Sequence, residues 1–394
     1  MTEREIFLQH IGQTSPNPLL LNIKSARNIY LYDDQGRQII DLCSGVSVSN
    51  LGHNHPAVVQ AVKEQVDRYM HLMVYGELIE TPQVQYAKLL VDNLPESLNA
   101  VYFVNSGSEA IEGAMKLAKK YTNRSEIISF WNAYHGSTQG ALSLYGDLDF
   151  TRPFRPLLPD IRRLDFGQTD QLEQITERTA AVVIEPIQAE GGVVIPSKQY
   201  MQRLRQKCDE KGCLLIFDEV QTGFGRTGKL FAFEHFDIVP DILVIAKAAG
   251  GGMPLGAFIA DKKIMDVLAK NPPLGHITTF GGHPVSAAAG YAALKVLLHE
   301  KIIDTVPQKG QMFIDLLKDH PKIKNIRGIG LLIGVQLFDA EQVTRLMDIF
   351  VKNGLMTDRF LFARDMFRIG PPLIITEEQI RSVVEIIRRS LDEL

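Results

Sequence analysis

Lys247 is the residue of this chain whose position best suits covalent chemistry. It follows an apolar run, Ile242–Ala246, that is typical of a buried strand, and glycines at 250–252 come directly after it. Because burial disfavours the charged form of an amine, such a lysine can attack a carbonyl carbon and form a Schiff base. A lysine at the end of a strand can also simply extend into solvent. Its companions in the sequence therefore decide between the two interpretations.

The first companion is Asp218, which ends a second apolar strand, Leu214–Phe217. Ligands bind at the carboxyl edge of such sheets, so this carboxylate can ligate a metal, act as a base or hold a protonated ring nitrogen. No His or Cys cluster with ligand spacing accompanies it, which disfavours a metal. A structural alternative, in which Asp218 caps the following loop, explains this residue alone equally well.

Two further segments suit a flat, anionic ligand. Ser106, Gly107 and Ser108 lie between an expected strand and an expected helix, where free amides bind anions, although an ordinary N-cap serine gives the same pattern. Tyr134 and His135 follow another strand, and the tyrosine can stack on a ring or pack on the core.

Three charged residues complete the set. Glu185 and Glu190 flank a proline and precede a glycine pair, a pattern that is also typical of turns. Arg368 precedes Gly-Pro-Pro, so it can clamp a carboxylate from a loop or lie on the surface. An anion cradle, an aromatic plate, an acid for a ring nitrogen and a Schiff-base lysine together predict a pyridoxal 5′-phosphate (PLP) site.

With these motifs in place, the chain resembles the class III (ω-amino acid type) aminotransferases of PLP fold type I, the acetylornithine, ornithine and 4-aminobutyrate aminotransferases among them. The resemblance covers nearly the whole length. The runs Phe217–Gly228 and ILVIAKAAGGGMP carry it most specifically, and SGSEA, YHG and NLGHNHP add to it.

The resemblance implies a role for each cofactor-binding residue. Lys247 would carry PLP and move a proton, and Asp218 would keep the pyridine nitrogen protonated. Tyr134 and Val220 would pack on the two faces of the ring, with Gln221 near its phenolic oxygen. The other expected contacts are Ser106, Gly107 and Ser108 around the phosphate, His135, Glu185, and Thr279 from the neighbouring subunit of a homodimer.

The resemblance also implies how substrates bind. Arg368 would fix 2-oxoglutarate or glutamate, and Glu190 would pair with it while the amine-bearing substrate is bound, giving a ping-pong transamination. Two positions depart from the family pattern. Ser137 replaces an arginine, losing a contact worth roughly 1.5–3 kcal/mol, and Val46 in the substrate pocket replaces the tyrosine of ornithine enzymes.

Arg152 and Arg155 can replace the missing arginine or lie in solvent. The amine donor is therefore left open, as are a transaminase that prefers pyruvate and an aminomutase or racemase on the same scaffold. A non-catalytic PLP-binding module is disfavoured because the catalytic set is complete. A nucleotide-binding protein is disfavoured because no GxGxxG or Walker-type loop follows a strand.

These residues require an α/β fold, with a mostly parallel seven-stranded sheet implied by the resemblance. Strands are expected at 101–104, 127–130, 181–185, 214–218, 242–246 and 257–260, and helices at 109–121, 171–176 and 198–211. At the two ends, a hairpin near residue 35, a strand at 328–338 and helices at 341–353 and 377–394 are expected. We expect a large PLP-binding domain at 55–297 and a small α+β domain formed by 1–54 and 298–394.

Composition excludes several other classes of protein. The net charge of -4 in 394 residues offers no basic surface for nucleic acid or membranes. Three cysteines without a CxxC pair indicate a reducing compartment. Without an apolar signal segment or a long apolar window, we expect a cytoplasmic protein.

Overall fold

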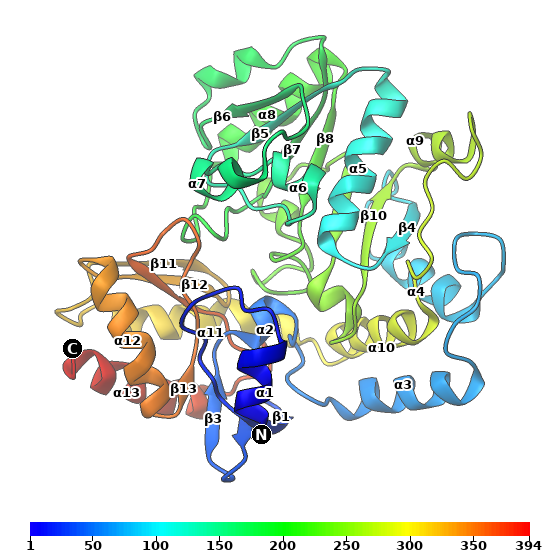
Figure 1. The fold of residues 1–394 in the computed structure, drawn as a ribbon. Coiled ribbons are helices and arrows are strands. Elements are labelled where there is room, and N and C mark those ends of the chain that lie inside the picture. Colours follow the sequence, from blue (N-terminus) through cyan, green and yellow to red (C-terminus); the bar gives the residue numbers. More distant parts are fainter.

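The middle of the chain forms a seven-stranded sheet. The computed structural model describes Met1–Leu394 and is shown in Figure 1. The strands pair in the order β4 (Ala100–Val104), β10 (Gly256–Ala260), β9 (Ile242–Ile245), β8 (Leu214–Asp218), β7 (Thr179–Ile184), β5 (Glu126–Phe130) and β6 (Ile161–Leu164). Six of the strands run in the same direction, and β10 runs in the opposite direction. The predicted α/β fold with a mostly parallel sheet is confirmed.

Alternation along each strand places apolar side chains on both faces of this sheet. On β8, Leu214 and Ile216 join one buried cluster, while Leu215 and Phe217 join another on the opposite face. Helix α5 (Gly107–Thr122) covers the first face, and α8 (Lys198–Lys211) packs against β7 and β8 on the second. Strands that are buried on both faces have continuous apolar sequences, which is why the sequence predicts them well.

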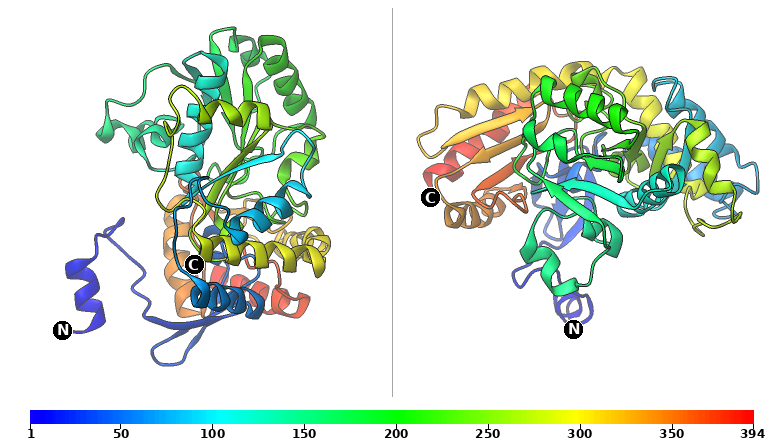
Figure 2. Two further views of the ribbon diagram at one scale, coloured as in Figure 1. Left: turned by 90° about the vertical axis from the view of Figure 1, so that its right-hand side faces the viewer. Right: turned by 90° about the horizontal axis from the view of Figure 1, so that it is seen from above.

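The remaining helices surround these layers (Figure 1). Helix α10 (Pro284–His299) packs against α3 (Pro56–Arg68) and α4 (Thr81–Val91). Helix α1 (Glu3–His10) stands away from the rest of the chain (Figure 2), and none of its residues is buried. The short helices are α2 (Ser44–Ser47), α6 (Gln139–Ser143), α7 (Leu148–Thr151) and α9 (Lys262–Met265). No helix is both long enough and apolar enough to span a membrane.

The two ends of the chain come together in smaller sheets. One contains β1 (Ile23–Arg27), β2 (Tyr30–Asp33), β3 (Gln38–Asp41) and, parallel to β3, β13 (Leu355–Met356). The other contains β11 (Asn325–Ile329), β12 (Leu332–Gln336) and β14 (Met366–Ile369). The helices of this part are α11 (Ile302–Leu317), α12 (Ala340–Lys352) and α13 (Glu377–Asp392). The domain bounds given above stay a prediction.

Two local predictions need correction, and one strand is additional to those expected. The helix expected at 171–176 is a short 3₁₀ helix, Asp170–Gln174. The single strand expected at 328–338 is part of a hairpin, because Gly330 adopts a positive φ of 56° and turns the chain between β11 and β12. The edge strand β6 was not predicted, because its sequence, IRRL, lacks a continuous apolar run.

The fold brings the predicted residues to one edge of the large sheet. Strands β5, β7, β8 and β9 are parallel, and β4 has the same direction because β10 is antiparallel to both β4 and β9. Their carboxyl ends therefore lie together, and each is followed by one of the predicted motifs. The amino end of β10 closes the same edge.

A close contact between α11 and the β11–β12 turn gives a test of this packing. A Cβ atom on Gly310 would lie 1.9 Å from the carbonyl oxygen of Gly330, so the helix must move to accept alanine. We expect Gly310→Ala to lower the free energy of unfolding by about 1–3 kcal/mol. Gly12→Ala, where a Cβ meets nothing within 4 Å, is the matched control. Equal denaturation midpoints for the two variants would show that the contact is unimportant.

Candidate active site

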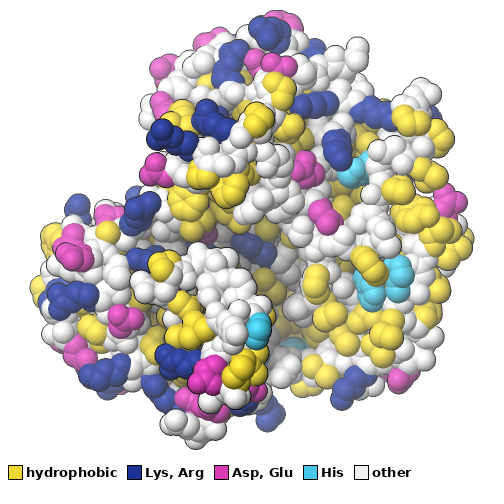
Figure 3. All heavy atoms as spheres, viewed as in Figure 1, with side chains coloured by type: hydrophobic (Ala, Val, Ile, Leu, Met, Phe, Trp, Pro, Cys, Tyr) yellow, Lys and Arg dark blue, Asp and Glu magenta, His cyan; other side chains and the backbone are white.

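A cavity of about 380 Å³ lies at the carboxyl edge of the large sheet. Figure 3 shows this face of the molecule hollowed between the part with the large sheet and the part with the smaller sheets. Every predicted cofactor contact except Thr279 lines the cavity, namely Ser106, Gly107, Ser108, Tyr134, His135, Glu185, Asp218, Val220, Gln221 and Lys247. Side chains separated by up to 141 positions in the sequence thus share one space.

The start of α5 forms one end of this cavity. Ser106 is the N-cap, and its hydroxyl accepts a hydrogen bond from the Glu109 amide at 3.2 Å. The first amides of a helix have no partner within the helix, so they are free to bind an anion. Space is tight here, because a Cβ on Gly107 would lie 3.0 Å from the side chain of Val220. The predicted anion cradle therefore has the required backbone and small residues.

Asp218 is a buried carboxylate held in a fixed orientation. Its Oδ2 lies 2.7 Å from Nδ1 of His135, and its Oδ1 accepts the Val220 amide at 3.0 Å. The Nε2 atom of His135 is buried and has no hydrogen-bond partner. The sequence predicts both residues at the site, but only the fold shows that the histidine acts on the aspartate.

Lys247 lies at the end of β9, beside Gln221. Its Nζ donates to Oε1 of Gln221 at 3.4 Å, while Nε2 of the same glutamine is buried without a partner. Burial lowers the pKa of Lys247, and the positive charge of Arg368 adds to this effect. The carboxylates of Glu190 and Asp218 oppose it. A larger fraction of the amine is therefore uncharged near neutral pH than in an exposed lysine.

Glu185 lines the same cavity from the end of β7. It accepts the amides of Tyr134 and Ala189, each at 3.2 Å. Burial raises its pKa well above the ordinary value, and the neighbouring charge of Asp218 raises it further. Because burial and a neighbouring like charge both disfavour ionisation, Glu185 favours the neutral form.

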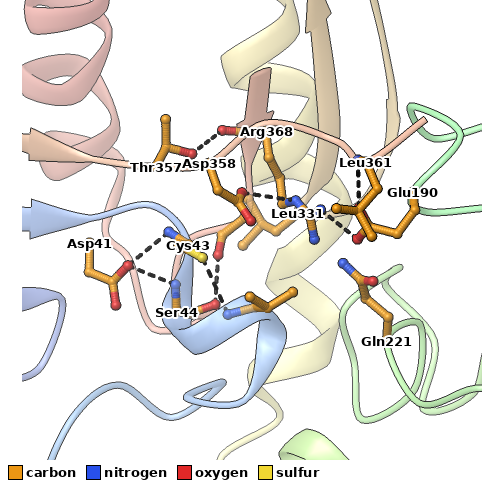
Figure 4. Close-up of polar contacts among 12 residues, drawn as sticks. Asp41, Cys43, Ser44, Glu190, Gln221, Leu331, Thr357, Asp358, Leu361 and Arg368 are labelled. Carbon is orange, nitrogen blue, oxygen red and sulfur yellow. Dashed lines mark hydrogen bonds and ion pairs between the residues drawn. The ribbon is translucent and has the colours of Figure 1, made fainter. Parts of the chain in front are cut away.

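Arg368 and Glu190 form a buried ion pair next to this cavity (Figure 4). Nη2 of Arg368 donates to Oε1 of Glu190 at 2.6 Å, and Oε2 of Glu190 accepts the Leu361 amide at 3.1 Å. Burial opposes the charge of Arg368, but the carboxylates of Glu190 and Asp358 outweigh it and raise its pKa. Nη1 of Arg368 is buried without a partner. Arg368 lies on strand β14 and not on the expected loop, and it is a buried, paired residue and not a surface charge.

Other predicted residues do not line this cavity. Thr279 is exposed, on a loop whose preceding residue, Thr278, accepts a hydrogen bond from Asn105 at 3.0 Å. Val46 is half-buried in α2, where its φ of 59° is strained for a β-branched residue. Whether either contacts a ligand stays a prediction.

The structure also shows where Ser137, which departs from the family pattern, and the two nearby arginines lie. Ser137 is exposed, and its hydroxyl lies 3.1 Å from the hydroxyl of Tyr145. Arg152 and Arg155 are exposed as well, and neither lines the cavity. No group of three or more His, Cys, Asp or Glu side chains is arranged to hold a metal ion.

Sequence reasoning missed two residues near Arg368. Asp358 lies on the irregular segment between β13 and β14, and Arg226 is a fully buried guanidinium. Arg226 falls within the most specific motif, so the resemblance could have indicated it. Asp358 has no regular element or spacing that links it to the site, and only the structure reveals it.

The cavity fits PLP. Gln221 offers an unpartnered buried amide beside Lys247, Asp218 offers a fixed carboxylate, and the start of α5 offers free amides for a phosphate. A mostly parallel sheet that holds a buried lysine, an aspartate and an anion cradle at one edge defines a PLP-dependent enzyme.

Comparisons with known proteins identify the family. A sequence model described as aminotransferase class-III matches residues 11–391. The acetylornithine aminotransferase of Methanopyrus kandleri is 41% identical over 90% of both chains. That of Methanocaldococcus jannaschii is 37% identical over 100% of this chain and 96% of its own.

A solved structure agrees. The ornithine aminotransferase of Toxoplasma gondii, with PLP in partial occupancy at its active site, has a TM-score of 0.91 and 31% identity over 99% of this chain and 93% of its own. The chain belongs to the class III aminotransferases and is a PLP-dependent transaminase.

The lowered pKa of Lys247 has a measurable consequence. In cofactor-free protein, raising the pH through this pKa converts the ammonium into the reactive amine, so its labelling by trace acetic anhydride should reach half-maximum below the ordinary value of 10.5. Mass spectrometry of the peptide containing Lys247 over a pH series measures this midpoint. A midpoint at 10.5 or above would contradict the effect of burial.

Proposed function

We propose that this enzyme transfers the amino group of an ω-amino acid or related amine to 2-oxoglutarate by a ping-pong mechanism. The observation that carries the proposal is the buried Arg368–Glu190 pair beside the Lys247 cavity. A ping-pong transaminase must accept two different substrates in one pocket, and an arginine with an internal carboxylate partner serves both. The resemblance to named acetylornithine and ornithine aminotransferases supports this substrate class.

The chain supplies a base and an acid for the reaction. PLP, when bound, withdraws electrons from the carbon that loses its proton. Lys247 would hold the cofactor and then carry the proton on Nζ, which the lowered pKa of this amine favours. Asp218, fixed by His135 and the Val220 amide, would hold the proton of the pyridine nitrogen. Gln221 would donate from its unpartnered amide to the ring's phenolic oxygen.

Arg368 and Glu190 would allow one pocket to bind the two substrates in turn. While the amine donor is bound, Glu190 neutralises the guanidinium. When a dicarboxylate enters, its carboxylate replaces Glu190 and also reaches the unpartnered Nη1. Exchange of one carboxylate for another keeps Nη2 of the buried guanidinium paired, which avoids leaving this donor without a partner.

The donor's remote end meets a neutral position at residue 137. Ser137 contacts Tyr145, and the exposed Arg152 and Arg155 do not line the cavity. An ionic contact of the kind implied for the family is therefore missing at this position, so an ω-amino acid donor would bind its remote carboxylate without the family's arginine. An aminomutase or racemase has no need to exchange Glu190 for a second substrate's carboxylate, so the ion pair favours transamination.

The half-reaction with glutamate tests the proposal. Purified protein with PLP should be yellow. Excess glutamate should bleach its near-visible band and release 2-oxoglutarate in an amount equal to that of the bound PLP. Lys247→Ala should lack this band and lose turnover at least about 10³-fold, while its circular dichroism spectrum stays unchanged. A band that persists under excess glutamate but bleaches with alanine would instead assign pyruvate as the acceptor. Isomerised amine without any oxo acid would assign an isomerase.

We further propose that the functional unit is a homodimer. Large apolar side chains are exposed on the face carrying α3, α4 and α10, where Figure 3 shows hydrophobic surface, and they include Met70, Leu72, Met73, Leu78, Ile79, Ile277 and Phe280. Exposed apolar patches of this kind mark interaction sites. The loop with the exposed Thr279 lies among them, which supports its contribution to the neighbouring subunit's site.

Mixed dimers test the sharing of sites. Thr279→Glu places a negative charge where the phosphate should bind, and Lys247→Ala removes the amine, so each variant alone should be inactive. After unfolding and refolding together in equal amounts, half of the dimers are mixed and each of these has one intact site. We expect about a quarter of wild-type activity. No recovery in refolded mixtures, with recovery of refolded wild type as the control, would show that each site uses its own Thr279.

A further inference from the structure

A second carboxylate faces Arg368 from the side opposite Glu190. The ion pair between Nε of Arg368 and Oδ1 of Asp358 measures 3.1 Å, and both residues are labelled in Figure 4. The arginine side chain is 1% exposed, whereas that of Asp358 is 33% exposed. One buried guanidinium therefore has two carboxylate neighbours, one of which remains open to solvent.

The backbone fixes Asp358 in this place. The carbonyl oxygen of Asp358 accepts the Arg368 amide at 3.0 Å, and the hydroxyl of the preceding Thr357 donates to the Arg368 carbonyl. Two adjacent contacts between these segments leave the aspartate little freedom to move away. Glu190 is held differently, because its side chain comes from the loop after β7 in the large-sheet part of the molecule.

The segment that carries Asp358 also holds the guanidinium by other means. The ring of Phe360 lies under it, with 4.7 Å from the guanidinium carbon to the ring centre, and Phe360 is itself buried. The Leu361 amide binds Glu190. Because the ring and Glu190 both restrain Arg368, removal of Asp358 should change the charge next to the arginine more than its position.

From this arrangement we propose that Asp358 is a specificity-determining residue that weakens the binding of dicarboxylates at Arg368. The proposal rests on the proposed function, in which a substrate carboxylate displaces Glu190. After that displacement Arg368 still faces the negative charge of Asp358, so the incoming anion meets a neutral pair instead of a free cation. Donors that leave Glu190 in place do not meet this penalty.

Asp358 would thus set the balance between the two half-reactions. By lowering the affinity for dicarboxylates, Asp358 would limit how strongly 2-oxoglutarate and the product glutamate compete with the amine donor for the pocket. The charge is close enough to Arg368 for a large effect, since interactions between charges at this separation exceed thermal energy even at a high effective dielectric constant.

Glutarate, a five-carbon dicarboxylate that cannot react, is a suitable probe. Its dissociation constant for the PLP-loaded enzyme can be measured by isothermal titration calorimetry. We expect Asp358→Asn to bind glutarate at least about tenfold more tightly than wild type, with a matching fall in the KM for 2-oxoglutarate. The KM for an amine donor should change less than threefold.

Matched variants separate charge from structure. Asp358→Glu keeps the charge and should remain within about threefold of wild type. Asp365→Asn removes a charge from the same segment, where the aspartate binds Gln336 at 2.6 Å and not Arg368, and should leave glutarate binding unchanged. If Asp358→Asn does not fold, Asp358→Ser makes the same test with a smaller side chain.

The outcomes distinguish this inference from the proposed function. Arg368→Gln should weaken glutarate binding strongly, and unchanged binding would refute the carboxylate clamp itself. If Arg368→Gln weakens binding but neutral variants at 358 bind glutarate no more tightly than wild type, only the role of Asp358 is refuted. Equal losses for dicarboxylate and amine donor in Asp358→Asn would show a merely structural role and would also overturn the inference.

Discussion

The active site depends on a balance among charges that are removed from water. Lys247 and Arg368 are the basic groups, and the acidic side chains of Glu185, Glu190, Asp218 and Asp358 lie near them. No single pair is sufficient, because each buried charge needs an opposite charge or a hydrogen bond to offset its loss of hydration. The proposed substrate exchange at Arg368, the neutral form of Glu185 and the reactive amine of Lys247 are all connected with this balance. The rest of the molecule serves to hold these groups in place.

Arg226 shows how the two parts of the chain hold the site together. This fully buried guanidinium donates to the carbonyl oxygens of Leu331 and Pro371 at 3.0 and 2.6 Å and to the side chain of Asn50 at 2.6 Å. It thereby joins the loop after β8 to segments from both ends of the chain. Burial lowers its pKa to about 9, with a further contribution from the positive charge of Arg368. All of its hydrogen-bond acceptors are neutral.

The residues of the candidate site lie on two kinds of backbone. The residues expected to contact the cofactor lie at or follow the ends of strands in a doubly covered sheet, where the backbone has little freedom. Of the proposed substrate contacts, Arg368 lies on β14, whereas Glu190 and Asp358 lie on the loop after β7 and on the segment between β13 and β14. Ser137 and Asp358 both lie outside helices and strands.

The sequence by itself determined the class of chemistry and most of the large sheet. Buried parallel strands are continuous apolar runs, and the residues that follow them must meet at one edge, so Lys247, Asp218 and the start of α5 could be assigned without coordinates. The tertiary structure decided that His135 holds Asp218, that Glu190 reaches Arg368 across 178 positions, and that Asp358 joins them. Such contacts depend on how loops bring together residues that are distant in the sequence. No local periodicity records that geometry, because it is set by packing and charge compensation over the whole chain.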